Sequence, residues 1–412
     1  MNWPFLRRYI LAFGDQGLTA LLSLFVSLWL IRRGGPEEFG AYVFWASTAL
    51  VVSTFAGSLT SVHLHRLRPA PLEGRRNIER ALLAANILLA GLAAGLTLAA
   101  LPLLGAPLAV WGAALLVPGT LIGIYARVLA TSRARLEPAL AISLIVALVV
   151  VGGMGLGAAL GLPATANQVL VLAGLAQGGA GAVVLWRLSP GLAPDWAGRR
   201  WRALLRRSLW PLAGGMANEV ATRLYVFLVA AWGGTAAMAA LAAAQTLLRP
   251  ATLLAGAWGG AARSALARLG HAQDHAGFAR LVTLGALGPA LVTLLLGGGL
   301  ALFWPWVSWA AYGGRYAELA PVVLLWTVTM AISCFVFVFG VALQALGRLD
   351  AAARSDIAAA GVIAASMPVA LWLLPPPGAL LAMILGGLVQ VAIQLRALRV
   401  ALRPRHPGSN RR

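Results

Sequence analysis

Apolar runs of about 20 residues, separated by short polar segments, repeat along almost the whole chain. A run of that length, wound into a helix, crosses the hydrocarbon core of a bilayer. Hydrophobic residues make up 60% of the chain and charged residues only 11%, far fewer charges than a soluble domain carries. The sequence therefore predicts an all-α polytopic membrane protein.

Twelve such runs can be drawn, six on each side of a basic segment. The expected spans are 10–31, 40–62, 81–103, 108–130, 138–161, 167–188, 209–231, 236–262, 281–303, 319–343, 355–374 and 378–400. The expected organisation is an N-lobe at 1–188, a basic cytoplasmic interlobe linker at 189–208, a C-lobe at 209–400 and a basic cytoplasmic tail at 401–412. We expect the second half of the linker, with Trp196 and Trp201, to lie along the inner headgroups.

The arginines predict the orientation, because short cytoplasmic loops retain positive charge. With the N-terminus inside, 27 of the 32 basic residues fall on the cytoplasmic side, and both termini are cytoplasmic. No small-residue cleavage site follows the first apolar run, so it is expected to remain as a span. The net charge of +20 does not indicate nucleic acid, because the arginines lie between apolar runs and not on one soluble surface.

Three pairs of matching sites, each about 200 residues apart, indicate an internal repeat. They are Gly34-Gly35 with Gly233-Gly234, Arg80 with Arg280, and Arg135-Leu136-Glu137 with Arg348-Leu349-Asp350, at offsets of 199, 200 and 213. The repeat predicts two six-helix lobes in the same orientation around a central cavity. Parallel repeats of this kind recur in transporters, with the substrate site at the lobe interface.

The stretch from Asn218 to Pro250 places Glu219, Arg223 and Arg249 within apolar sequence. A charge at that depth costs roughly 2.5 to 3.5 kcal/mol on insertion scales and usually marks function. Arg249 lies about 14 residues into the predicted eighth span, near the midplane. It either grips a substrate anion with bidentate geometry or serves as a structural ion pair or carbonyl cap. Pro250 removes a backbone hydrogen bond and favours a kink that could help the span bend.

Glu219 and Arg223 are four residues apart, hence on one helix face, where they could neutralise each other. Alternatively, Arg223 binds substrate anion while Glu219 takes up a proton that couples transport to the proton gradient. Asn218 and Tyr225 could add hydrogen bonds to the substrate near this face.

Asp15 lies one or two turns into the first span, seven residues from Arg8 on the same face. It is either half of a boundary ion pair with Arg8 or a carboxylate that binds a coupling ion. Weaker candidates for substrate contact are Gln16, Gln245, Tyr125 and Arg127, of which Arg127 is also expected as an interface anchor. His63 and His65 have no metal-ligand partners at useful spacing and are expected among the inner headgroups.

Three short stretches carry a resemblance to a known family. GGPEEFGAY at 34–42, YGGRYAELAP at 312–321 and QALGR at 344–348 resemble loops of the polysaccharide-biosynthesis flippases, the Wzx-like branch of the multidrug/oligosaccharidyl-lipid/polysaccharide (MOP) exporter superfamily. The resemblance implies a flippase for an undecaprenyl-pyrophosphate-linked oligosaccharide, with a cationic cavity lined by spans 1, 2, 7 and 8. Arg223 and Arg249 fall on spans 7 and 8. Asp15 resembles the acidic residue on the first span of drug-exporting relatives.

The expected function is to move this lipid-linked oligosaccharide from the inner to the outer leaflet of the bacterial inner membrane by alternating access. The oligosaccharide would then serve surface polysaccharide biosynthesis. Its expected partners are the lipid-linked oligosaccharide, membrane lipids and other polysaccharide-assembly proteins, without nucleic acid. The chain has no nucleotide-binding motif and no nucleophile-base constellation, so no enzyme activity and no cofactor are expected beyond a coupling H⁺ or Na⁺. One alternative is a MATE-like proton- or sodium-coupled drug/cation antiporter. A second is a membrane enzyme acting on polyprenyl-linked glycans, although the short external loops count against it.

Overall fold

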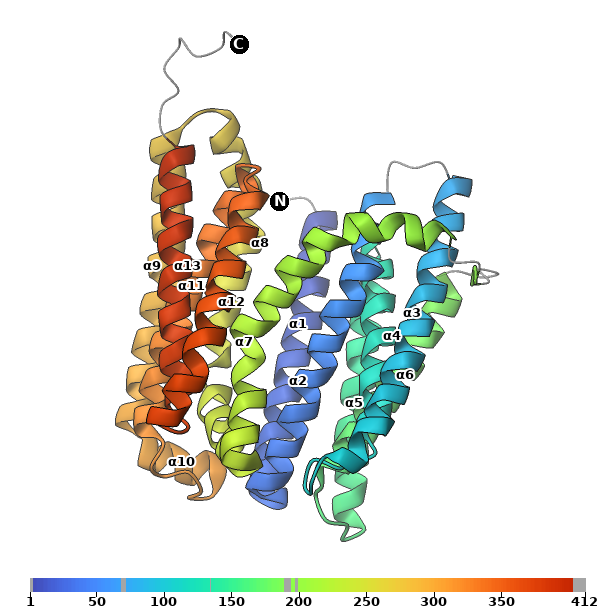
Figure 1. Cartoon of the computed structure of the whole chain (residues 1–412), viewed down its shortest axis with the longest axis vertical. Helices are drawn as coiled ribbons and strands as arrows, with labels where there is room; N and C mark the ends of the chain where they lie inside the picture. The colour runs from blue at the N-terminus through green and yellow to red at the C-terminus, as the bar shows by residue number, and fades with distance from the viewer. Residues whose placement is uncertain (1–2, 68–71, 134, 189–193, 197–198, 403–412) are drawn as a thin grey trace. The chain divides into compact units, whose positions relative to one another are not determined.

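The structure is a computed structural model that describes residues 3–67, 72–133, 135–188, 194–196 and 199–402. Within these ranges the chain is almost wholly helical and forms no strand. The α-helices are α1 (Trp3–Trp29), α2 (Pro36–Leu59), α3 (Leu72–Ala100), α4 (Ala113–Ser132), α5 (Glu137–Ala159), α6 (Ala166–Leu188), α7 (Arg199–Thr246), α8 (Arg249–His271), α9 (His275–Leu302), α10 (Trp304–Tyr312), α11 (Ala320–Ala345), α12 (Leu349–Leu373) and α13 (Gly378–Ala401) (Figure 1). The predicted tail from 403 onwards, and linker residues 189–193 and 197–198, lie outside the described residues.

Eleven helices among the described residues are long and apolar enough to cross a membrane. The count falls below the twelve predicted spans because α7 holds the seventh span and the first part of the eighth. The rest of the predicted eighth span begins α8, which is not among the eleven. The other predicted spans each correspond to one helix, within several residues at their ends. The chain is thus a multi-pass membrane protein, and the predicted all-α fold is confirmed.

Two glycines have the same unusual backbone conformation at matching places in the repeat. Gly35, between α1 and α2, has φ 100° and ψ 175°. Gly234, where α7 bends, has φ 75° and ψ 177°. This region of backbone space is essentially restricted to glycine. The repeat inferred from the two Gly-Gly pairs therefore appears as one backbone geometry used twice.

The GGPEEFGAY stretch has a structural role at each of several positions. Pro36 begins α2, where its missing N–H costs no helical hydrogen bond. The Glu38 carboxylate accepts a 2.5 Å hydrogen bond from the backbone N–H of Ala166, the first residue of α6. A Cβ atom on Gly40 would lie 2.3 Å from the carbonyl oxygen of Thr235 in α7. The stretch thus joins α2 to two other helices at one end of the spans.

Helices α4 and α6 pack with their backbones almost in contact, as small residues allow in membranes. A Cβ atom on Gly119 of α4 would lie 2.2 Å from the carbonyl oxygen of Gly174 in α6. A Cβ atom on Gly181 would lie 3.0 Å from the Cα atom of Gly123. The glycine spacing on each helix therefore decides how closely the two helices approach.

Adding one methyl group on this pair of helices is expected to have opposite effects at two positions. Gly119→Ala should lower stability by about 1 to 3 kcal/mol, because the new methyl meets backbone that cannot rotate away. Gly179→Ala, on α6 but with no atom within 4 Å of the added methyl, should be neutral or stabilising by about 0.5 kcal/mol through helix propensity. Thermal unfolding followed by helical circular dichroism compares them. Equal effects would contradict this account of the packing.

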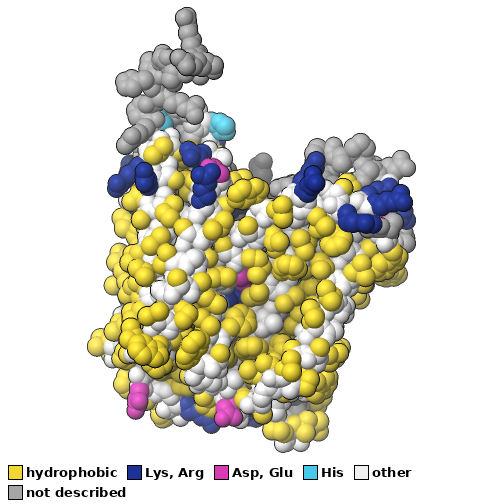
Figure 2. Space-filling model, in the orientation of Figure 1, with side chains coloured by type: hydrophobic (Ala, Val, Ile, Leu, Met, Phe, Trp, Pro, Cys, Tyr) yellow, Lys and Arg dark blue, Asp and Glu magenta, His cyan; other side chains and the backbone are white. Residues whose placement is uncertain are grey.

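The chain divides into two compact units. Unit 1 comprises Met1–Glu219 and Val229–Ala242, and unit 2 comprises Val220–Leu228 and Ala243–Arg412, so α7 contributes to both. Unit 1 has an apolar core between α2, α3, α4 and α6, and unit 2 has one between α8, α9, α11, α12 and α13. Hydrophobic side chains cover most of the face in Figure 2, and arginines gather mainly near helix ends. This is the pattern of a lipid-facing band with charged rims.

Candidate functional site

Tyr225 is the centre of a polar cluster in unit 2. Its hydroxyl donates a 3.2 Å hydrogen bond to the side-chain carbonyl oxygen of Gln245, further along α7. Its ring packs edge-on against Trp326 of α11, with 5.3 Å between ring centroids. The tyrosine is buried, and Gln245 is half-buried. Two residues predicted separately as substrate contacts are therefore neighbours.

Two arginines bring positive charge to this cluster. Arg223 and Arg249 are both half-buried, and both lie within electrostatic range of the Tyr225 hydroxyl. The structure thus brings together four predicted substrate-binding residues, the two arginines with Tyr225 and Gln245. All four belong to unit 2.

The chain around Arg249 is a helix break and not the kink within one span that the sequence predicts. Helix α7 ends at Thr246, Leu248 donates its N–H to the Gln245 carbonyl at 3.0 Å, and α8 begins at Arg249. Pro250 is exposed and lies in the first turn of α8, where proline is well tolerated. Proline therefore starts a new helix here, and Arg249 is its first residue.

Tyr312, at the end of α10, is a neighbour of this cluster that the sequence analysis did not single out. Its hydroxyl donates a 2.8 Å hydrogen bond to the carbonyl oxygen of Ala243 in α7, and it lies within electrostatic range of Arg249. Burial raises the pKa of Tyr312 above its usual range, and burial raises the pKa of Tyr316 to about 12. Tyr312 is therefore a neutral donor at physiological pH. Its position at the start of the YGGRYAELAP stretch was the available signal.

Glu219 lies in unit 1, in the part of α7 that precedes the cluster. It is 8% exposed, and one carboxylate oxygen accepts a 2.7 Å hydrogen bond from the hydroxyl of Thr54 on α2. Asn218 beside it is exposed. The structure therefore gives the carboxylate a partner on another helix, which the analysis of α7 alone did not foresee.

Asp15 is paired with Arg127 of α4, at 2.5 Å between carboxylate and guanidinium. The same carboxylate oxygen accepts a hydrogen bond from Ser143 of α5. Both members of the pair remain about one quarter exposed. Arg127 is thus an ion-pair partner within unit 1, and the contacts of Asp15 join α1 to α4 and α5 there. The side chain of Arg8 lies outside the described residues, and Gln16 is exposed.

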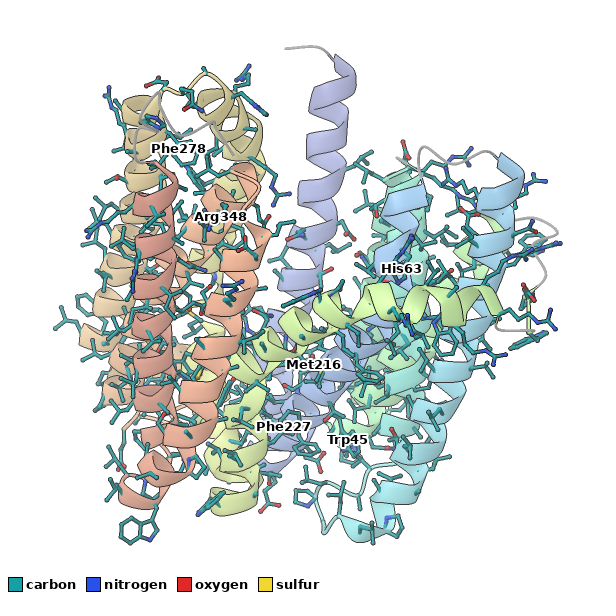
Figure 3. All side chains as sticks on the ribbon, turned by 45° about the horizontal axis from the view of Figure 1, so that its top comes forward. Trp45, His63, Met216, Phe227, Phe278 and Arg348 are labelled. Carbon is teal, nitrogen blue, oxygen red and sulfur yellow. The ribbon has the colours of Figure 1, made fainter. Side chains whose placement is uncertain are left out.

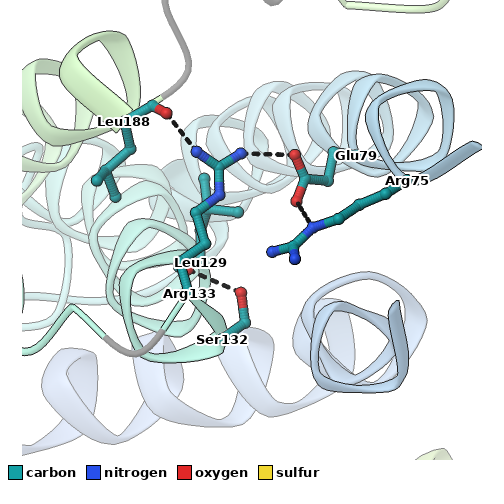
Figure 4. A network of polar contacts seen from close by, with 6 residues as sticks. All are labelled: Arg75, Glu79, Leu129, Ser132, Arg133 and Leu188. Carbon is teal, nitrogen blue, oxygen red and sulfur yellow. Dashed lines mark hydrogen bonds and ion pairs between the residues drawn. The ribbon is translucent and has the colours of Figure 1, made fainter. Parts of the chain in front are cut away.

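A second ion network, which the sequence analysis missed, surrounds Glu79 of α3 (Figure 4). Glu79 is 2% exposed and accepts from Arg75 Nε at 2.9 Å and from Arg133 Nη2 at 2.6 Å. Arg133 also donates to the carbonyl oxygen of Leu188 at the end of α6. Glu79 therefore links α3 to the end of α4, and Arg133 links α4 to the end of α6. The sequence analysis counted Arg75 and Arg133 only among the cytoplasmic charges and did not consider Glu79.

A further carboxylate that the sequence analysis missed lies between α12 and α13. Asp356 accepts a 2.6 Å hydrogen bond from the side-chain amide of Gln390, and one turn along α13 Gln394 donates to Ser355 at 3.1 Å.

Among the described residues there is no group of three or more His, Cys, Asp or Glu side chains able to hold a metal ion.

Comparison with known proteins indicates the fold. No family model matches the sequence, and no curated protein matches it. A solved structure of the lipid II flippase MurJ, in an inward closed conformation, has a TM-score of 0.76 at 12% identity, over 96% of this chain and 87% of that chain. An inward-facing multidrug resistance MATE family transporter of the MOP superfamily has a TM-score of 0.73 at 14% identity, over 93% of this chain and 94% of that chain.

A third similar structure is a MOP superfamily transporter from Pyrococcus furiosus that is described as having a binding pocket of reverse polarity. Its TM-score is 0.66 at 15% identity, over 96% of this chain and 95% of that chain. The chain therefore has the fold of MOP superfamily transporters, including the arrangement of helices in two lobes that the repeat predicted. At these identities the likeness concerns the fold and not the substrate.

Proposed function

We propose that the protein is a flippase that moves an undecaprenyl-pyrophosphate-linked oligosaccharide from the inner to the outer leaflet of the cytoplasmic membrane by alternating access. The observation that carries this proposal is the gathering of Arg223 and Arg249 around Tyr225 and Gln245 in unit 2. A planar guanidinium can form two parallel hydrogen bonds to a phosphate. The electrostatic attraction between the two groups is stronger in a poorly hydrated site than in water. The amide and hydroxyl add hydrogen-bonding groups suited to sugars.

Moving a pyrophosphate through apolar surroundings requires groups that replace its hydration. Two arginines supply that compensation without proton transfer, because arginine remains charged at every physiological pH. The shared fold supports the proposal, since one protein with it is a lipid II flippase. The end product would be surface polysaccharide, assembled with other polysaccharide-assembly proteins.

A coupling ion would act at the carboxylates of this chain. Glu219 and Asp15 are our candidates, for H⁺ or Na⁺, since each is held by a hydrogen-bonding partner on a different helix. Pro250 and the break before it would supply the flexibility for alternating access, because a short helix interruption can bend at little cost.

The second candidate function is a MATE-like drug/cation antiporter. Asp15, held by Arg127 and Ser143, favours it, because a carboxylate on the first helix is a natural exchange site for a proton and a cation. Several proteins with this fold are MATE transporters. The two arginines in unit 2 count against it, because they would repel a cationic drug.

Reconstitution of the purified chain into vesicles distinguishes the two functions. With a labelled undecaprenyl-pyrophosphate oligosaccharide placed in one leaflet, we expect the label to become accessible to a membrane-impermeant reagent on the other side. Ethidium flux under a proton or sodium gradient should stay at the level of empty vesicles. Ethidium flux that Asp15→Asn abolishes, without lipid translocation, would establish the antiporter instead. A chemically altered lipid-linked glycan would indicate an enzyme.

A further inference from the structure

The first part of α7, residues 199–210, forms an amphipathic arm that crosses unit 1 before the helix turns into the membrane (Figure 1). Pro211 lies inside α7 directly after the arm, and a proline within a helix favours a bend. The arm therefore runs in a different direction from the spanning part of the same helix.

One side of the arm is bound to the body of unit 1. Trp201 donates from its indole nitrogen to the Leu59 carbonyl at 3.0 Å, and the Ser208 hydroxyl lies 2.8 Å from a ring nitrogen of His63. Ser208 and His63 are both buried, and Figure 3 shows His63 beside this part of α7. Both Trp201 and His63 thus hold the arm to unit 1, and the expectation that they lie at the level of the headgroups stays a prediction.

The other side of the arm carries arginines. At about 100° per residue, they fall on the half of the helix opposite Trp201 and Ser208. All five are exposed, and they are Arg199, Arg200, Arg202, Arg206 and Arg207. The arm contains no acidic residue, and Arg200 forms an ion pair with Asp195, which precedes the arm, at 3.2 Å.

An exposed tryptophan shows which medium this face meets. Trp210 is 69% exposed and lies, by the same helical geometry, among the arginines, and Leu209 beside it is 62% exposed. A surface that faced only water would seldom combine these side chains. Arginine next to exposed tryptophan is typical of a helix in the headgroup layer, where the ring lies at the boundary and the guanidinium reaches phosphate.

We infer that the arginine face of the arm is a binding surface for anionic phospholipid in the leaflet expected to be cytoplasmic. The charge of the face complements a phosphate-bearing headgroup that has no neutralising choline or ethanolamine. Each arginine near such a surface strengthens binding by about fivefold. Because the arm and the spanning part of α7 are one chain segment, bound lipid would fix the end of the helix that leads to Glu219 and Arg223. This inference does not depend on the proposed substrate.

The test uses the whole chain in a neutral detergent, titrated with phosphatidylglycerol or phosphatidylcholine and followed by native mass spectrometry. We expect phosphatidylglycerol to bind the unmodified protein more tightly. The double variant Arg206→Gln/Arg207→Gln should lose binding by roughly 25-fold, or fivefold for each charge. Arg206→Lys/Arg207→Lys should retain most of it, and high salt should weaken the interaction.

The matched control is Arg396→Gln/Arg399→Gln, which removes two exposed arginines near the end of α13. It should leave phosphatidylglycerol affinity within about twofold of the unmodified protein. Equal affinity for the two phospholipids, or an equal loss in the control, would overturn the inference. So would retention of phosphatidylglycerol binding by Arg206→Gln/Arg207→Gln, because that result would leave the arginine face to another partner, such as an acidic protein.

Discussion

Replacing Arg249 by Ala is expected to abolish surface polysaccharide in cells and to lower lipid translocation in vesicles strongly, while the protein remains inserted at normal levels. Hydrogen bonds to a charged group contribute about 1.5 to 3 kcal/mol each. Losing one such contact with pyrophosphate would lower transport roughly tenfold to hundredfold. The guanidinium lies near Tyr225 and Tyr312, so its removal also changes the charge of that whole cluster.

Two further variants serve as controls for the Arg249→Ala experiment. Arg249→Lys keeps the charge but loses the planar fork, so we expect intermediate transport. Arg399→Ala removes an exposed arginine from the end of α13 and should transport normally. Normal polysaccharide with Arg249→Ala would remove Arg249 from the site. A loss of inserted protein in step with the loss of transport would instead assign the arginine a structural role.

Replacing Glu79 by Gln is expected to cause a large loss of stability in unit 1. The carboxylate is 2% exposed and holds Arg75 and Arg133, so its neutralisation leaves two guanidinium groups without their counter-charge. Breaking a buried ion pair usually costs about 3 to 5 kcal/mol. The arginines keep 19% and 22% exposure, so water recovers part of that cost and we expect about 2 kcal/mol.

Thermal unfolding in detergent measures this effect, with an exposed ion pair as the control. Arg348 and Asp350 are 3.5 Å apart and 42% and 55% exposed, so Asp350→Asn should change the unfolding midpoint very little. Combining Glu79→Gln with Arg133→Gln should cost less than the two changes added together, because they break the same contact. Strict additivity, or a shift no larger than that of Asp350→Asn, would contradict the interpretation of Figure 4.

The membrane-spanning helices could be predicted because their signal is local. An apolar run must hide its backbone in a helix wherever lipid surrounds it, so run length alone located most helix ends within a few residues. The two Gly-Gly pairs were visible for a similar reason, since only glycine adopts the backbone found at Gly35 and Gly234. Run length did not reveal a helix break inside a continuous apolar run. The apolar run at 236–262 conceals the break before Arg249 because both sides of the break are apolar.

The partners of the polar side chains were decided by the tertiary structure. Asp15 pairs with a residue 112 positions away, and Tyr312 reaches a carbonyl 69 positions away. Spacing within one helix shows which side chains share a face, but not which helix that face meets. Four of the candidate site residues could be selected from sequence, because a polar group costs so much in apolar surroundings that it stands out. Only helix packing brought Arg223, Tyr225, Gln245 and Arg249 together and placed Glu79 and its two arginines in one network.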